Sequence, residues 1–435
     1  MLDKTYKSMN NQIIPDKDLI EKTKNGMRIE LEKVKGPHRT FFRQPLALAV
    51  VICVFIMVSI PIMAATIPSF NRLLYIVSPD IAQYLQPIEL SSVSNDIEVD
   101  VVAAMNDDDM VYVYLTMEDL ASDRIDSTID LYNYTIRAAS MFTSELVNYD
   151  EAAKKATIRM IASGAKNLNG KKITVQLDSF LSGKQYYKDV ALNIDTKDIP
   201  NIKAETMSIS SPGGGGGDGY RELMEQENVS ILKPGQINTK VRDDMDFVSI
   251  SSIGYIDGLL HIQTEWEESI DNHGYISLDK ENGDRVYPYA NFSFGIDGKK
   301  YQEEIYQIPV QEIGHYSLIG NYTRDGYYVE GDWNVTFKIN TDDSSWIKIK
   351  DFKAGGLQID ELSITPIGLT IIGKVTDTDN VDVEIVKNDG SKITSGYTLN
   401  EKDDGVVRYK HIFELPIDVQ SIKEVRINGN IIPLQ

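Results

Sequence analysis

The sequence predicts a mostly β protein with some α structure, an α+β chain of several folding units, and three observations support this. At 435 residues the chain is too long for one ordinary domain, and 42% of it is hydrophobic, enough for real cores. From residue 246 onward, short runs rich in Ile, Val and Tyr alternate with Asp-Gly and Asn-Gly dipeptides. The stretch 46–67 carries no charge. We therefore expect one membrane-spanning helix followed by β-sandwich domains.

Charge and cysteine content exclude several functions. The formal net charge is -21, so the chain lacks the basic footprint of a nucleic-acid-binding protein. The charge is uneven, because residues 1–43 hold 10 Lys+Arg against 6 Asp+Glu, a net of +4. The one cysteine, Cys53, rules out an intrachain disulfide and a cysteine-based metal site.

The uncharged stretch 46–67, LALAVVICVFIMVSIPIMAATI, predicts a transmembrane helix. A helix of this length spans roughly 33 Å, enough for a hydrocarbon core of about 30 Å. The alternative is a cleaved signal peptide, but the charged region in front is over 40 residues long and the apolar run exceeds the usual core of such a peptide. We expect a retained anchor that contacts the lipid bilayer through these residues.

The flanking charges predict the orientation of this anchor. The 20 residues after Ile67 contain Arg72 as their only basic residue. The 20 residues before Leu46 contain five basic residues: Arg28, Lys33, Lys35, Arg39 and Arg43. The positive-inside rule then places the N-terminus in the cytoplasm and residues 68–435 outside the cell, in a single-pass membrane protein.

The cytoplasmic segment, residues 1–45, contains one predicted amphipathic helix within 15–37. Apolar residues recur with helical spacing at Ile20, Met27, Leu31 and Val34, and Gly36-Pro37 marks a stop. The segment offers nothing for this face to pack against, and an isolated helix of this length is marginal. Three interpretations stay open: a helix that docks on a partner protein, a helix on the inner membrane surface, and an inert tail.

The first extracellular unit is expected to be a membrane-proximal α+β domain at 68–210. Residues 68–88 read as one or two short amphipathic helices. The runs IEVDVVAAM and MVYVYLTM flank Asp107-Asp108-Asp109 and predict a hairpin, and residues 171–180 predict a further strand.

The glycine run SPGGGGGDG is expected to be a flexible hinge within a connector at 211–245. No Gly-Lys-Ser/Thr follows it and the preceding residues are polar, so a phosphate-binding loop is disfavoured. Two β-sandwich domains of Ig-like type should follow, at 246–343 and 344–435. Six turn dipeptides suit type I′ hairpins: Asp257-Gly258, Asn282-Gly283, Asp297-Gly298, Asp325-Gly326, Asp389-Gly390 and Asn428-Gly429.

No catalytic constellation emerges, so we expect a non-enzyme without a cofactor. The five histidines lack zinc-site spacing and are expected at surface or half-buried positions. The pattern Ser-x-x-Lys at Ser163–Lys166 and Ser345–Lys348 has no partner motif and is attributed to chance. One weak calcium candidate remains, because carboxylates alternate in DTDNVDVE at Asp377, Asp379 and Asp382.

Taken together, the segment IPDKDLIEKTKNGM, the single transmembrane stretch, PSFNRLLYIVSPDIAQYLQPI and the predicted hairpin resemble a family of Bacilli and Clostridia. Its members are single-pass, anti-sigma-factor-like regulators with a membrane-proximal domain of unknown function. The phrases SSIGYIDGLLHIQTEW and ITPIGLTIIGKV are similar to the Ig-like domains that often follow. The resemblance implies no catalytic residues. Its expected partner is an extracytoplasmic-function sigma factor, which would dock on Leu19, Ile20, Met27, Leu31 and Val34.

Two functional hypotheses follow from this organisation. In the first, extracellular β domains sense the state of the envelope and control a cytoplasmic sigma factor through the N-terminal helix. In the second, the chain is a membrane-tethered surface-binding or structural protein with an inert tail. An extracellular enzyme is a distant third for want of a catalytic set.

Overall fold

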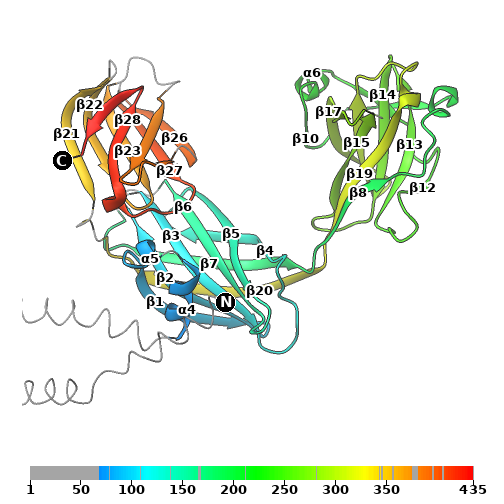
Figure 1. Ribbon diagram of the computed structural model, residues 1–435. Helices are drawn as coiled ribbons and strands as arrows, with labels where there is room; N and C mark the ends of the chain where they lie inside the picture. Colours follow the sequence, from blue (N-terminus) through cyan, green and yellow to red (C-terminus); the bar gives the residue numbers. More distant parts are fainter. Residues whose placement is uncertain are drawn as a thin grey trace, which may run out of the picture. The chain divides into compact units, whose positions relative to one another are not determined.

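The computed structural model describes residues 68–434 with short gaps (Figure 1). The gaps are 78, 108, 138, 165–167, 211, 281, 342, 344–345, 355–356, 375–380, 394–395 and 404–405. The predicted cytoplasmic helix and the stretch 46–67 therefore lie outside the described residues. Within the described part of the chain, no helix has the length and apolar character needed to cross a membrane. The described residues are mostly β, as predicted, and form several antiparallel sheets.

The first sandwich pairs a five-stranded sheet, β1-β2-β3-β6-β5, with a three-stranded sheet, β20-β7-β4. The predicted hairpin is confirmed, because β2 pairs with β3 around the acidic turn. The bounds are β1 Gln86–Ser94, β2 Ile97–Asn106, β3 Met110–Asp119, β4 Asp130–Arg137, β5 Met141–Asp150, β6 Lys155–Ser163, β7 Lys172–Ser182 and β20 Tyr327–Lys338.

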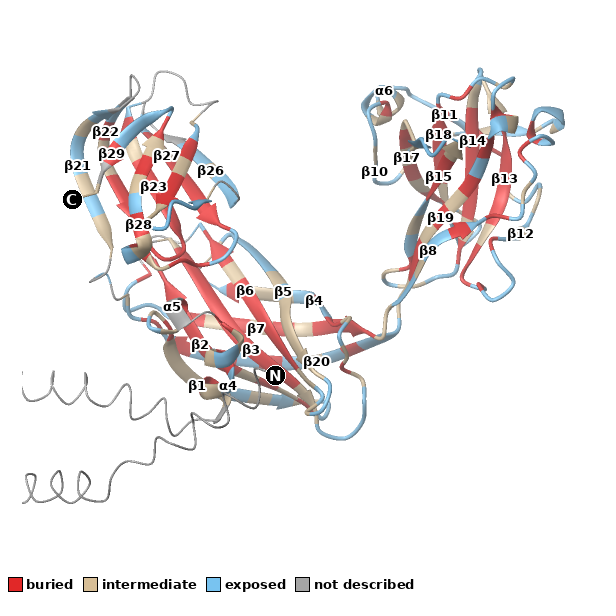
Figure 2. Cartoon of the chain, in the orientation of Figure 1, coloured by how far each residue is buried: buried red, intermediate tan, exposed pale blue. Residues whose placement is uncertain are grey.

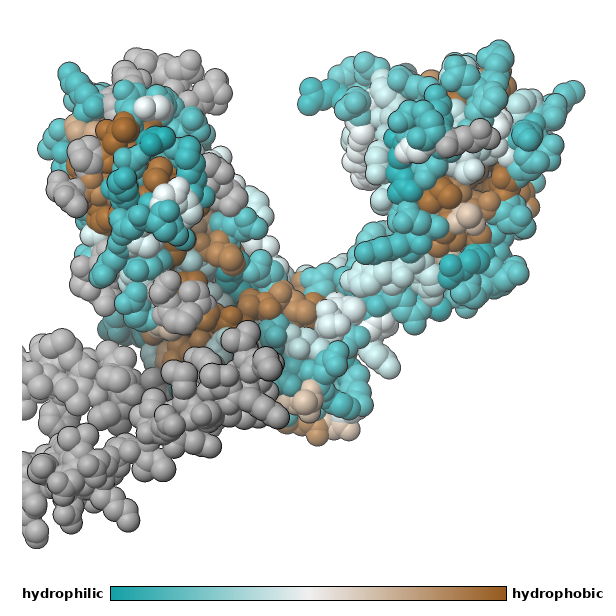
Figure 3. Space-filling model, in the orientation of Figure 1, coloured by the Kyte–Doolittle hydropathy of each residue, from teal (hydrophilic) through white to brown (hydrophobic). Residues whose placement is uncertain are grey.

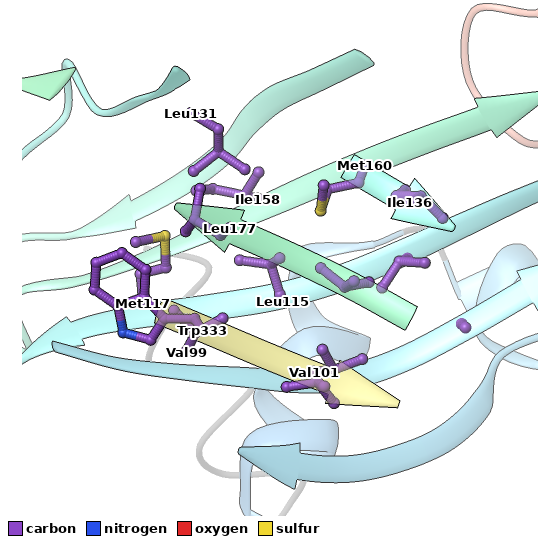
Figure 4. Close-up of a cluster of buried hydrophobic side chains, with 14 of the residues drawn as sticks. Val99, Val101, Leu115, Met117, Leu131, Ile136, Ile158, Met160, Leu177 and Trp333 are labelled. Atoms are coloured by element: carbon purple, nitrogen blue, oxygen red, sulfur yellow. The ribbon is translucent and has the colours of Figure 1, made fainter. Parts of the chain in front are cut away.

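The core of this sandwich lies between its two sheets, and Figure 4 shows side chains from both sheets pointing toward one another. Trp333 of β20 is fully buried there, and its indole Nε1 donates to the carbonyl of Ile97 over 2.9 Å. Burying a large aromatic ring whose N–H is satisfied contributes strongly to a core. Strands β3 and β6 are buried along most of their lengths on both faces (Figure 2), so the five-stranded sheet has a second covered side.

Two short helices precede the sandwich, as the sequence predicted: α4 (Pro68–Ile76) and α5 (Pro79–Ala82). Their apolar residues Phe70, Leu73 and Ile81 are buried. Amphipathic spacing explains this packing, because residues three and four apart share one helix face.

A second sandwich, spanning residues 185–324, is inserted between β7 and β20 of the first. One sheet has the order β10-β17-β18-β14-β13-β12, a second has β16-β15-β19-β8, and β9 pairs with β11. Its elements are β8 Gln185–Ala191, β9 Thr206–Ile209, β10 Gly215–Gly216, α6 Tyr220–Met224, β11 Val229–Leu232, β12 Thr239–Lys240, β13 Val248–Ile256, β14 Leu259–Trp266, β15 His273–Lys280, β16 Arg285–Val286, β17 Ala290–Ile296, β18 Lys299–Tyr306 and β19 Tyr316–Arg324.

This insertion corrects the expected domain boundaries at 210 and 245, whereas the break expected at 343 does fall between two sandwiches, after β20 ends at Lys338 and before β21 begins at Ile347. Strand β20 does not belong with 246–326, since it pairs with β7 from Tyr327↔Ser182 to Lys338↔Lys172. In Figure 1 the yellow β20 runs among the blue and green strands of the first sandwich. Strand β8, expected in the first domain, pairs with β19 instead. The chain therefore passes between the first and second sandwiches at two adjacent crossings, one after Ser182 and one before Tyr327.

The glycine run also differs from the expected hinge. Gly215 and Gly216 form the edge strand β10, which pairs with Phe292 and Asn291 of β17. A Cβ on Gly215 would lie 2.0 Å from the carbonyl oxygen of Asn291, whereas a Cβ on Gly214 would meet nothing within 4 Å. Glycine is needed at 215 for close backbone approach rather than for flexibility.

The third sandwich comprises residues 347–433, close to the predicted C-terminal domain. One sheet has the order β21-β22-β23-β27-β26 and the other β25-β24-β28-β29, with a mostly aliphatic core between them. The bounds are β21 Ile347–Ala354, β22 Leu357–Ile364, β23 Gly368–Lys374, β24 Val383–Lys387, β25 Lys392–Ile393, β26 Gly396–Asp403, β27 Val406–Phe413, β28 Ile422–Ile427 and β29 Asn430–Pro433.

Turn chemistry explains many of the hairpins in the second and third sandwiches. Both residues have positive φ at Asp257-Gly258, Asp297-Gly298 and Asn428-Gly429, which confirms the expected type I′ turns there. Asn282-Gly283 and Asp389-Gly390 have positive φ at the glycine alone, and Asp325-Gly326 lies in a crossing between sandwiches. The visible surface around these sandwiches is mostly hydrophilic, with apolar colour in limited patches (Figure 3).

Candidate functional site at a sandwich junction

The tip of the β2–β3 hairpin inserts its first aspartate into the third sandwich. Lys410 of β27 donates from Nζ to Asp107 Oδ2 over 2.5 Å, and it also pairs with Asp109. The hydroxyl of Thr365 donates to Asp107 Oδ2 over 3.2 Å. Arg408 Nη2 reaches Asp109 Oδ2 over 2.9 Å. Two carboxylates and two cations from opposite sandwiches thus form one network, which we call the ionic junction.

Burial makes the ionic junction energetically demanding. Asp107 and Lys410 are each 2% exposed. Burial raises the pKa of Asp107, although Lys410 opposes the shift, whereas Lys410 and Arg408 outweigh burial at Asp109 and lower its pKa. Removing one partner of such a pair leaves an uncompensated buried charge, which costs about 3–5 kcal/mol. The junction can therefore hold the sandwiches in one arrangement, and its loss would release them.

Further polar contacts surround the ionic junction. Tyr112 donates from its hydroxyl to the Phe413 carbonyl over 3.4 Å. Arg159 donates from Nη2 to the Glu414 carbonyl over 3.1 Å. The hydroxyl of Tyr84, just after α5, donates to Asp418 Oδ1 over 3.1 Å. The third sandwich is thus tied both to the five-stranded sheet and to the segment that follows the N-terminal helices.

The second sandwich carries a separate buried polar cluster. Glu303 accepts from the Leu232 amide over 3.0 Å and lies 2.7 Å from His261 Nδ1. The neighbouring Glu304 faces the other side of β18, where the Ile276 amide and the Tyr306 hydroxyl donate to it over 3.0 and 2.9 Å. Burial raises the pKa of Glu304 to about 8. Both carboxylates are buried and satisfied, as structural core groups should be.

Most of the site residues predicted from the sequence lie outside the described residues. The partner-docking residues Leu19, Ile20, Met27, Leu31 and Val34 lie outside the described residues, as do Asp377 and Asp379. Asp382 is exposed, and its amide donates to Asn428 Oδ1 over 2.8 Å. Among the described residues, no group of three or more His, Cys, Asp or Glu is arranged to hold a metal ion.

Other expectations about polar residues need correction. His261 and His411 are buried at 4% and 5% exposure rather than being at the surface or half-buried, because both lie at buried positions of strands that are paired on both sides. Ser163 ends β6 and is also buried, while Lys166 and Ser345 lie outside the described residues.

The ionic junction was missed at the sequence level. The sequence predicts only a hairpin turn at the acidic triplet, yet Asp107 is buried. One signal was present: the run VVRYKHIF alternates apolar residues with Arg408 and Lys410, placing two cations on one face of a strand that is otherwise core-like. A cation on such a strand implies a buried anion elsewhere in the chain.

The fold and the junction define a β-sandwich protein with one nested insertion, and known proteins add little to that description. No family model and no curated protein matches the chain. A solved structure, the crystal structure of the conserved domain protein from Bacillus anthracis, is 10% identical and has a TM-score of 0.19. The match covers 72% of this chain and 85% of that chain. At this TM-score the likeness carries no functional argument.

Proposed function

We propose that the chain is a single-pass membrane regulator of the anti-sigma-factor type, in which extracellular sandwiches control a cytoplasmic sigma factor. The N-terminal organisation supports this: an amphipathic segment, five basic residues and an uncharged stretch precede the β structure. In this proposal the second and third sandwiches are of Ig-like type. The partner is an extracytoplasmic-function sigma factor docked on the apolar helix face.

The observation that carries the proposal is the attachment of helix α4. This helix begins at Pro68, one residue after the uncharged stretch ends, and its residues Phe70 and Leu73 are buried. The Glu89 carboxylate accepts from the Phe70 amide, and Arg72 lies 3.6 Å from Asp150. In this proposal, movement of the first sandwich passes through α4 to the membrane anchor expected at 46–67.

Glu89 gives this attachment a specific geometry. It occupies a positive φ of 53° where the β1–β2 register shifts, a conformation that an L-residue adopts at a cost. Burial and the nearby Asp100 raise the pKa of Glu89 to about 7. A strained residue with a shifted carboxyl beneath α4 is a suitable place for a regulator to change state.

The direct test is capture of the full chain from membranes together with an extracytoplasmic-function sigma factor. We expect Leu31→Asp to abolish capture and to raise transcription from promoters of that sigma factor, because a carboxylate enters the apolar face. Asn25→Asp, which adds the same group on the opposite side of the predicted helix, should leave both unchanged. Equal behaviour of the two variants, with no sigma factor captured, would leave the surface-binding hypothesis in its place.

A further inference from the structure

A groove of about 440 Å³ lies beside the ionic junction, between the first and third sandwiches. Its floor is the outer face of the five-stranded sheet. Cross-strand register identifies that face: Tyr112 is opposite Ile161, which is opposite Thr143 on β5. The next row along the same face is Met110, Ser163 and Met141. The alternate residues, such as Val111, belong to the sandwich core instead.

The wall of the groove comes from the third sandwich. Tyr397 of β26 stands opposite Ile412 of β27, and both line the groove. Tyr397 is 70% exposed, and Met141 on the floor is 49% exposed. Large apolar side chains gathered around a concavity at a domain boundary are typical of ligand sites.

Arg159 supplies a charged group at the inner end of the groove. It is 4% exposed, and its guanidinium lies 5.5 Å from the centre of the Tyr112 ring. Its Nη2 serves the Glu414 carbonyl and pairs with Glu145. Its Nε is buried and has no hydrogen-bond partner among the residues that the structure describes. A buried N–H left without an acceptor is unfavourable, so an incoming acceptor at this position would be favoured.

We propose that this groove binds a small aromatic carboxylate. The ring of the ligand would lie over Tyr112 and Ile161 and against Tyr397, and its carboxylate would accept from Arg159. Arginine recognises carboxylates with its planar fork of donors, and the groove volume is within the range of small-molecule sites, about 300–1,000 Å³. Glu145, whose side chain is 49% exposed, can turn to water and give up its place at the guanidinium.

The test uses the full chain in lipid nanodiscs with 4-benzoylbenzoate, an aromatic ketone and carboxylate that couples to nearby C–H bonds under near-ultraviolet light. Peptide mapping by mass spectrometry should place the label on segments containing Met110 and Met141. Naphthalene-2-carboxylate should compete for labelling, whereas naphthalene-2-methanol, which lacks the charge, should compete at least about tenfold more weakly.

Variants at two positions make the proposal falsifiable. Thr143→Trp fills the floor from an exposed position of β5 and should abolish the groove label, whereas Ser317→Trp on an exposed position of β19 should not. Arg159→Lys keeps the charge but removes the planar donors, and it should reduce the preference for the carboxylate competitor, whereas Arg159→Gln, which also removes the charge, should erase it. Thermal unfolding of each variant identifies any loss of folding.

Contrary outcomes are equally clear. Label spread over the chain, label unchanged by Thr143→Trp, or equal competition by the alcohol would overturn the proposal and leave the groove an apolar space between domains. Because binding is measured without a sigma factor, this result is independent of the proposed regulatory function.

Discussion

The first sandwich meets its two neighbours through junctions of opposite character. Toward the third sandwich it presents the ionic junction, in which Asp107 and Lys410 are both buried. Toward the inserted sandwich it presents two chain crossings, where Lys184 pairs with Asp130 over 2.8 Å and with Asp271 over 2.7 Å. Those carboxylates are 54% and 29% exposed, so water screens them. We therefore expect the first and third sandwiches to be held in one arrangement and the inserted sandwich to be held more loosely.

The backbone at the crossings supports the same distinction. Gly183 and Gly326 lie close together, because a Cβ on Gly326 would be 2.4 Å from the Gly183 carbonyl oxygen. Asp126 accepts from the Ser182 hydroxyl and the Gly183 amide, which fixes one crossing locally. These bonds join residues 56 and 57 positions apart in the chain, whereas the Asp107–Lys410 pair of the ionic junction joins residues 303 positions apart.

The largest expected effect is at the ionic junction. Lys410→Met should lower the free energy of unfolding by about 3–5 kcal/mol, because Asp107 is left buried without a counterion. Denaturant unfolding of the full chain would measure this. Lys350→Met, which removes an exposed cation 3.9 Å from Glu361, should cost less than about 1 kcal/mol. If both variants lost the same small amount, the junction would not hold the sandwiches together.

The next largest effect on stability is expected in the inserted sandwich, at the glycine edge strand β10. Gly215→Ala should destabilise by about 1–3 kcal/mol, because the new methyl group overlaps the Asn291 carbonyl and forces the backbone apart. Gly214→Ala is the matched control, since its Cβ would meet open space. Thermal unfolding compares the two. A true flexible linker would tolerate both changes equally.

The buried carboxyl of Glu304 predicts a pH dependence specific to the inserted sandwich. Its folded pKa of about 8 lies above its ordinary value of 4.5, so the folded state holds the proton more tightly. The stabilisation is therefore complete below about pH 4.5 and is lost as pH rises toward 8, with a slope of at most about 1.4 kcal/mol per pH unit. Glu304→Gln should reduce this slope and leave the part that Glu89 contributes, whereas Glu312→Gln, on an exposed position, should keep it in full. Parallel slopes would contradict the assignment.

The smallest effect on the free energy of unfolding is expected at the two chain crossings between the first and the inserted sandwich. Lys184→Ala should change the global free energy of unfolding by roughly 1 kcal/mol or less, because both of its partners reach solvent. Limited proteolysis should nevertheless cut faster after Ser182 or near Asp325. A global loss as large as that of Lys410→Met would mean that the two junctions are alike.

The sequence predicted what depends on neighbouring residues. The β2–β3 hairpin, helices α4 and α5, and three of the six expected type I′ turns follow from local periodicity and turn chemistry. The pairing of β20 with β7 did not, because alternation shows that a strand exists and says nothing of its partner some 150 residues away. The glycine run has the same composition whether it is a linker or a packed edge strand.

The candidate site could be predicted from the sequence even less well than the fold. Only burial distinguishes Asp107, Lys410 and Arg159 from ordinary surface charges, and burial of a charged residue is set by long-range packing. The proposed docking face at Leu19 to Val34 stays a prediction from helical spacing, since it lies outside the described residues.

The most direct test of the two-junction account is a distance measurement between spin labels on the full chain in nanodiscs. After Cys53→Ser, one label on Asn133 of the first sandwich is combined with a second on Lys423 of the third or Ser317 of the inserted sandwich, all exposed positions. The account predicts a narrow distance distribution for Asn133–Lys423, a broad one for Asn133–Ser317, and broadening of the first alone by Lys410→Met. Two equally broad distributions, or a narrow Asn133–Lys423 distance that survives Lys410→Met, would contradict it.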